Sequence, residues 1–70
     1  MDNREVKKLG LYDDSVFIAD GVQLSGPENI KIGKDANIWY NSVLRSSGKD
    51  IVIGDRTNIQ DGSVIHIATN

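Results

Sequence analysis

Two stretches of the chain decide its fold: IKIGKDANIWYNSVL at residues 30–44 and IVIGDRTNIQDGSVI at residues 51–65. When the second stretch is laid over the first, seven of the fifteen aligned pairs are identical, each at a separation of 21 positions. The shared residues are isoleucine at 30, 32 and 38, glycine at 33, asparagine at 37, serine at 42 and valine at 43. An internal repeat of this length indicates one structural unit that recurs and stacks on its neighbour.

A shorter period of six residues lies inside each repeat. Aliphatic residues recur at positions 32, 38 and 44 and again at 53, 59 and 65, and the residue four positions after each of them is small. The small residues are Ala36, Ser42, Gly48, Thr57, Ser63 and Thr69. A period of six fits neither an α-helix nor a long strand alternation. It predicts short strands joined by tight corners, with three strands in each triangular coil.

The predicted fold class is therefore all-β, a parallel β-helix of hexapeptide repeats with about two and two-thirds coils. The chain is expected to form one domain, with a lead-in at residues 1–14 and coils at residues 15–70. Three aliphatic ladders are expected to fill the interior: Ile18 with Ile38 and Ile59, Leu24 with Leu44 and Ile65, and Ile32 with Ile53.

Glycines and asparagines recur at the expected corners, and we expect them to supply positive φ angles there. They are Gly21, Gly33, Gly54 and Gly62, with Asn37, Asn41 and Asn58. We reject helices within the repeats, because β-branched residues dominate the short segments between these turn residues. A small β-sandwich is the alternative fold.

Composition points to a small domain that needs a partner. The 70 residues carry a net charge of −2 and no cysteine. Because so short a chain buries only about 60% of its unfolded surface, we expect it to oligomerise. Arg4, Lys7 and Lys8 are offset by Asp2 and Glu5, so we expect a solvated N-terminal segment and no nucleic-acid partner. The sequence shows no secretory signal and no membrane-spanning run, which favours a cytoplasmic protein without a membrane partner.

Three segments resemble a known family. IADGV at residues 18–22, IGKDANIWYNSVLR at 32–45 and IVIGDRTNIQDGSVIH at 51–66 are similar to the first coils of γ-class carbonic anhydrases, and the similarity runs from Ser15 to His66. The resemblance implies a left-handed β-helix and a homotrimer. It also implies zinc sites between subunits, each with three histidines drawn from two chains.

The resemblance also assigns roles to four residues. By motif position, His66 matches the first zinc ligand, and Gln60 matches a catalytic glutamine that orients the zinc-bound hydroxide. Arg45 and Asp61 also match residues of the family's catalytic site, where they form an ion pair across the subunit interface. The chain departs from the family at Ser47, where an aspartate is usual, and the family's other two histidines lie in coils beyond position 70.

These observations favour a structural function. We expect a truncated, catalytically silent relative that acts as a homo-oligomeric interaction module, because one histidine per chain is a poor zinc site. His66 should point outward beside Arg45, while Trp39 and Tyr40 should pack at the interface. Two trimers could also pair end to end through the open last coil. A zinc-dependent carbonic anhydrase completed by another chain is the first alternative, and a hexapeptide acyltransferase is the second.

Overall fold

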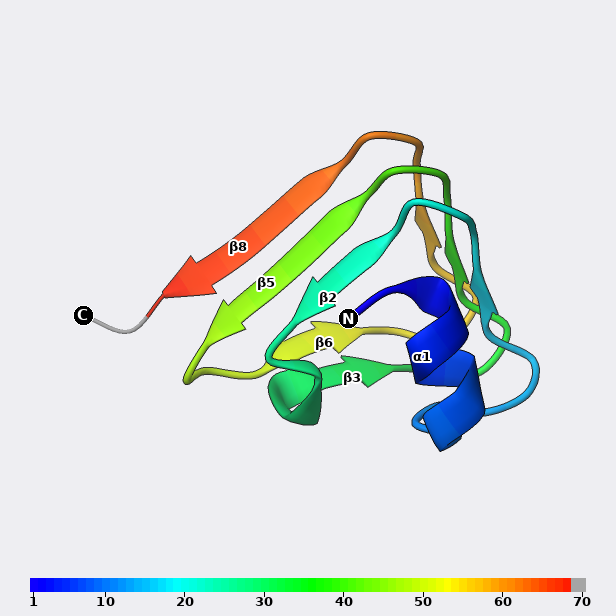
Figure 1. The fold of residues 1–70 in the computed structure, drawn as a ribbon, viewed down its shortest axis with the longest axis horizontal. Helices are drawn as coiled ribbons and strands as arrows, with labels where there is room; N and C mark the ends of the chain where they lie inside the picture. The colour runs from blue at the N-terminus through cyan, green and yellow to red at the C-terminus, as the bar shows by residue number, and fades with distance from the viewer. Residues whose placement is uncertain (69–70) are drawn as a thin grey trace.

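The computed structural model describes residues 1–68, which form a short triangular β-helix with one helix packed against it (Figure 1). The first coil contains β1 (Phe17–Ile18), β2 (Gln23–Ser25), a short 3-10 helix (Pro27–Asn29) and β3 (Ile30–Ile32). The second contains β4 (Asn37–Ile38), β5 (Val43–Ser47) and β6 (Ile51–Ile53), and the third contains β7 (Asn58–Ile59) and β8 (Val64–Ala68). None of the helices within residues 1–68 is long and apolar enough to cross a membrane.

Each side of the triangle is a parallel sheet made by successive coils. The strand orders are β1-β4-β7, β2-β5-β8 and β3-β6, and every pairing within them is parallel. In the second sheet Leu44 faces both Leu24 and Ile65, and in the first Ile38 faces both Ile18 and Ile59. Ile32 faces Ile53 in the third. All three predicted ladders are confirmed, and with them the predicted class, a left-handed parallel β-helix.

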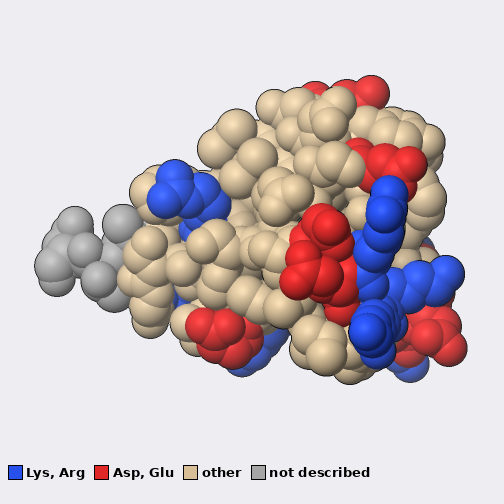
Figure 2. Space-filling model, viewed as in Figure 1, with Lys and Arg blue, Asp and Glu red and all other residues tan. Residues whose placement is uncertain are grey.

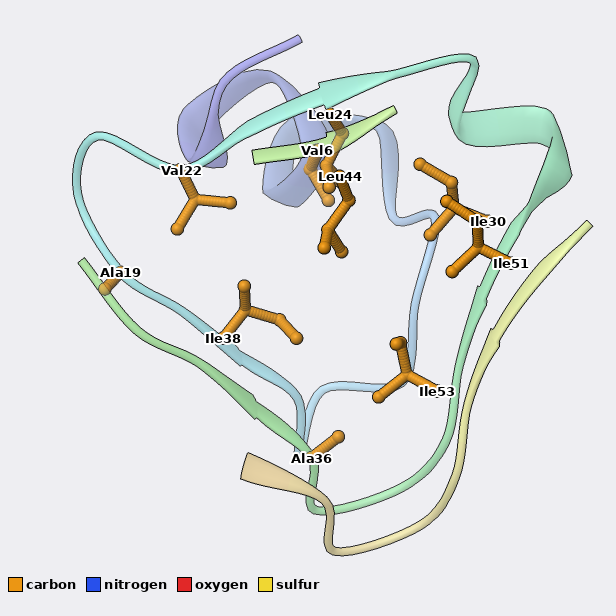
Figure 3. Packing of buried hydrophobic residues seen from close by; sticks show 10 residues of the cluster. All are labelled: Val6, Ala19, Val22, Leu24, Ile30, Ala36, Ile38, Leu44, Ile51 and Ile53. Atoms are coloured by element: carbon orange, nitrogen blue, oxygen red, sulfur yellow. The ribbon is translucent and has the colours of Figure 1, made fainter. Parts of the chain in front are cut away.

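The core runs along the axis of the coils. Figure 3 shows its side chains pointing toward the centre of the triangle from all three sides. Ile38 and Leu44 in the middle coil are completely buried, because a coil lies on each side of them. Ala36 and Ser42, two of the predicted small corner residues, are also completely buried, where a larger side chain would meet the neighbouring coil. Thr69, the last of that series, lies outside the described residues.

Two glycine corners were predicted wrongly. The positive φ angles lie at Asp35 (60°) and Arg56 (57°), and not at Gly33 and Gly54 two residues before them. Gly33 is needed for a different reason. A Cβ atom at this position would lie 2.6 Å from the backbone nitrogen of Asp55, so the close approach of the next coil requires glycine there.

The asparagine corners divide in the same way. Asn41 has the expected positive φ of 61°, as do Gly21 at 80° and Gly62 at 70°. Asn37 and Asn58 instead lie within β4 and β7, and the Asn37 amide donates a hydrogen bond of 3.0 Å to Asn58 Oδ1. The prediction failed for this pair because a stacked amide also favours asparagine at equivalent positions of successive coils.

The lead-in contains a helix that the sequence analysis did not predict. Helix α1 (Asn3–Leu9) begins with a capping box between Asp2 and Glu5 and ends at Gly10, whose φ is 62°. One side chain of the helix, Val6, is only 3% exposed and belongs to the core. The segment is therefore packed through Val6, while its charged side chains and Leu9 are exposed. The helix lies on the first coil (Figure 1), and Met1 and Asp2 just before it bond to the backbone of β2.

Candidate functional site

The candidate site begins with two side chains that stack on one outer face. Arg45 in β5 lies directly opposite His66 in β8, within the β2-β5-β8 sheet. Neighbouring strands of a sheet are about 4.8 Å apart, and side chains alternate between the two faces. Leu44 and Ile65 point inward, so Arg45 and His66 point outward, and both are exposed. The predicted placement of His66 one coil above Arg45 is confirmed.

Gln60 and Asp61 occupy the corner between β7 and β8, and both are exposed. The carbonyl oxygen of Gln60 accepts three hydrogen bonds. Ser42 Oγ donates at 2.8 Å, Ser63 Oγ at 2.7 Å and the backbone N–H of Ser63 at 3.2 Å. The backbone that carries Gln60 and Asp61 is thus held both from its own turn and from the coil below.

Ser42 also stabilises this corner, in a way that the sequence analysis did not predict. It was expected only as a small residue at a tight corner, and it does fill that place without exposure. Its hydroxyl, however, crosses to the next coil and binds the Gln60 carbonyl. The sequence did contain a signal for this hydrogen bond, because serine recurs at the equivalent positions 42 and 63 of the repeat. A serine hydroxyl can donate a hydrogen bond, which an alanine side chain cannot.

The donor set of one chain does not fit a catalytic zinc ion. Such a site needs three protein ligands and an open fourth position. Among residues 1–68 no group of three or more histidine, cysteine, aspartate or glutamate side chains converges to hold a metal. Asp61 lies at the corner and His66 lies in the middle of β8, so the two nearest candidates are separated by half a strand.

A cluster of three aromatic side chains lies on a second part of the outer surface. The ring centroids of Phe17 and Trp39 are 5.1 Å apart, and those of Trp39 and Tyr40 are 6.4 Å apart. Phe17 is 39% exposed and Tyr40 is 46% exposed, whereas Trp39 is half-buried and its Nε1 lies 3.4 Å from Asn58 Oδ1. The sequence pointed to Trp39 and Tyr40 but not to Phe17, which joins them from the first coil.

The predicted pair of Arg45 and Asp61 does not form within one chain. Within the part of the chain that the structure describes, the ion pair is a surface contact of 3.1 Å between Lys31 and Asp50. The side chains of Lys31 and Asp50 are 65% and 50% exposed, so the pair contributes at most about 1 kcal/mol to stability. Within residues 1–68, neither Arg45 nor Asp61 forms an ion pair, and their contact across an interface stays a prediction.

Comparison with known proteins gives several similar sequences. A carbonic anhydrase of Geobacillus kaustophilus is 45% identical over 56 residues, which cover 80% of this chain and 30% of that protein. The mitochondrial gamma carbonic anhydrase 2 of Arabidopsis thaliana is 41% identical over 61 residues, covering 87% and 21%. An uncharacterized transferase of Bacillus subtilis, YtoA, is 38% identical over 56 residues, covering 80% and 32%.

The chain thus spans between 21% and 32% of the length of these curated relatives. No family model matches the chain, and no solved structure matches it. The matched stretch nevertheless covers at least four fifths of the chain in each of these comparisons. The similarity therefore extends over most of the β-helix.

Proposed function

Since this chain is homologous to γ-class carbonic anhydrases over most of its length, we propose that it assembles with copies of itself into a homotrimer and serves as a structural or interaction module. In this proposal the chain alone does not hydrate carbon dioxide. The observation that carries the proposal is a surface rich in unpaired groups that suit an interface: the exposed aromatic rings and the unpaired Arg45 and Asp61.

The aromatic cluster supplies the apolar part of such an interface. Aromatic residues are enriched at subunit contacts because they bury a large area with few rotatable bonds. Phe17 and Tyr40 are each exposed by more than a third in the single chain, and Trp39 joins them into one continuous surface. A chain of 70 residues has a small core, so burial of this surface would add stability that the monomer lacks.

Arg45 and Asp61 supply the polar part. A guanidinium can bind a carboxylate through two parallel hydrogen bonds, which fixes orientation as well as distance. The Asp61 backbone is held by the three hydrogen bonds at the Gln60 carbonyl, and Arg45 lies within a paired strand. Both groups are therefore presented from rigid positions, and their pairing between subunits would define one register of assembly.

The second candidate function is a zinc-dependent carbonic anhydrase whose remaining ligands come from another chain. The observation that favours it is the exposed imidazole of His66, placed beside Arg45 on the outer face.

The first experiment is to measure molar mass by light scattering and zinc content in the same sample, purified without chelator. A trimer mass with little zinc supports the proposed module, and a doubled trimer mass supports end-to-end pairing as well. A trimer with about one zinc per chain that hydrates carbon dioxide supports the second candidate. A monomer at high concentration contradicts the proposal.

Charge variants test the interface itself. Arg45→Ala and Asp61→Ala should each dissociate the assembly, and the charge-swapped double variant Arg45→Asp with Asp61→Arg should restore it. Lys49→Ala is the matched control, because Lys49 is also exposed and lies just beyond β5. If Lys49→Ala weakens the assembly as much as Arg45→Ala does, net charge and not the specific pair governs association.

A further inference from the structure

A groove with no assigned role lies between helix α1 and the start of the first coil. Its cavity volume is about 530 Å³, which is within the range of small-molecule sites. The buried side chains Val6 and Ala19 form its floor, together with Ile18. None of Arg45, Gln60, Asp61 and His66 lines the groove, although Phe17 and Tyr40 of the aromatic cluster do.

The two walls of the groove carry opposite charges. Arg4 and Lys7, which are three residues apart and so share one face of α1, line one side. The other side includes the carboxylates of Asp13, Asp14 and Asp20. Figure 2 shows Lys and Arg side chains between groups of Asp and Glu at the right of the molecule, over the part that Figure 1 draws as α1.

These charges do not neutralise one another across the groove. Within residues 1–68, neither Arg4 nor Lys7 comes within ion-pair distance of a carboxylate. Asp20 accepts a hydrogen bond of 2.9 Å from Asn3, and Asp13 accepts one of 3.0 Å from the Ser15 backbone N–H. Asp14 has no comparable partner in the described part of the chain, so its carboxylate is the least satisfied of the three.

Aromatic rings line the same groove. Phe17 and Tyr40 reach it from successive coils, and the ring of Tyr12 is held at its edge by a hydrogen bond of 2.9 Å from the phenol to the Ile30 carbonyl. A ligand that enters the groove would therefore meet cations on one wall, carboxylates on the other and apolar ring surface between them.

We propose that this groove binds a zwitterionic amino acid with an aromatic side chain. The ligand carboxylate pairs with Arg4 and Lys7, and its ammonium group pairs with Asp14, so both walls are satisfied by one molecule. The ligand ring packs against Phe17 and Tyr40. A polyanion would be repelled by the acidic wall, and a simple organic cation would leave Arg4 and Lys7 unpaired.

The test compares three probes on the unaltered 70-residue chain by titration followed through backbone amide NMR shifts. L-phenylalanine carries both charges, 3-phenylpropionate lacks the ammonium group and 2-phenylethylamine lacks the carboxylate. We expect phenylalanine to bind with a dissociation constant on the order of 1 mM, as ligands of this size do. Each singly charged probe should bind at least about fivefold more weakly, and the shifts should centre on α1 and residues 10–20.

Two variants with matched controls test the assigned charges. Lys7→Gln should weaken phenylalanine binding by about threefold to tenfold without changing 2-phenylethylamine binding. Asp14→Asn should weaken phenylalanine binding to a similar extent without changing 3-phenylpropionate binding. Lys8→Gln and Asp35→Asn change exposed charges outside the groove and should change neither. Equal binding of all three probes, no binding up to about 10 mM, or equal effects of the control variants would overturn the proposal. Phe17 and Tyr40 also belong to the aromatic cluster proposed as the subunit interface, so the ligand and a neighbouring subunit compete for these two rings.

Discussion

Gly33 and Gly54 occupy equivalent positions one coil apart, and the structure predicts opposite responses when each is replaced by alanine. A Cβ atom at Gly33 would collide with the Asp55 side chain and would lie 2.6 Å from the Asp55 backbone nitrogen. A Cβ atom at Gly54 would meet only Thr57 Oγ1, at an ordinary distance of 3.5 Å. Neither glycine has a positive φ, so alanine causes no backbone strain at either position.

The magnitude follows from three contributions. Overpacking against a fixed backbone costs about 1–3 kcal/mol. Displacement of the Asp55 carboxylate would also break its hydrogen bond of 2.9 Å from the Lys34 N–H, which adds about 1 kcal/mol. Both alanine variants gain roughly 0.4–1 kcal/mol from lower entropy of the unfolded chain. Gly54→Ala should therefore be neutral or slightly stabilising, whereas Gly33→Ala should lose about 1–3 kcal/mol net.

Urea unfolding of both variants at one protein concentration, followed by Trp39 fluorescence and circular dichroism, measures the difference. A chain of this size has an m value of about 1 kcal/mol per M, and the entropy gain is common to both variants, so the two midpoints should differ by roughly 2–4 M. Equal midpoints would refute the argument that the second coil contacts the first closely at Gly33. A lower midpoint for Gly54→Ala would show that space above the second coil is filled in solution.

Three further changes test other parts of the structure. Ile38→Ala should cost about 2–5 kcal/mol, because its side chain is completely buried between two coils, whereas Val52→Ala, at 70% exposure, should change the urea midpoint little. Asp2→Ala removes the capping box of α1 and should cost about 1 kcal/mol in the same assay, with loss of helical circular dichroism. Burial raises the pKa of Tyr12 from 10.0 to about 12, with a smaller effect of Glu28, so its stabilising contribution is complete below pH 10 and is lost as the pH rises through 12. Tyr12→Phe should therefore flatten the fall in unfolding free energy over that interval, and an unchanged slope would contradict the assignment.

The ladders could be predicted from the sequence because their cause is local and periodic. Aliphatic side chains at Ile38 and Leu44 recur with the repeat, and a one-residue slip would turn every one of them outward. The same logic placed His66 directly above Arg45. Inward and outward faces, register and coil number all follow from the two nested periods.

The corners and the lead-in were harder to predict because one residue type can serve several purposes. Gly33 permits a close approach and Asn37 builds an amide stack, although both are also common in left-handed turns. The signals for α1 were present in the capping residues Asp2 and Glu5 and in Gly10 at the end, but the helix has a single buried side chain, Val6, so no apolar period marks it.

The candidate site could be predicted in its positions but not in its contacts. Arg45 and Asp61 were expected to meet between subunits, and a single chain cannot show that contact. The support that Ser42 gives to the Gln60 carbonyl depends on how a side chain of one coil reaches the next, which spacing alone does not reveal. The sequence therefore predicted where these side chains lie on the β-helix, whereas the contacts that hold their backbone depend on three-dimensional packing.

The nearly constant spacing of the strand pairs also governs how the chain can fold. Phe17 pairs with Asn37 at a separation of 20 residues and Asn37 pairs with Asn58 at 21, so each coil closes a loop of almost the same length. The entropy lost on closure is then nearly identical for every coil, because it depends on loop length. The strands of any one coil pair only with those of its neighbours, so the first pair of coils must form without a template. Folding should therefore be limited by whichever pair of coils forms first, after which the remaining coil adds at a similar cost in loop closure, as in other stacked repeats.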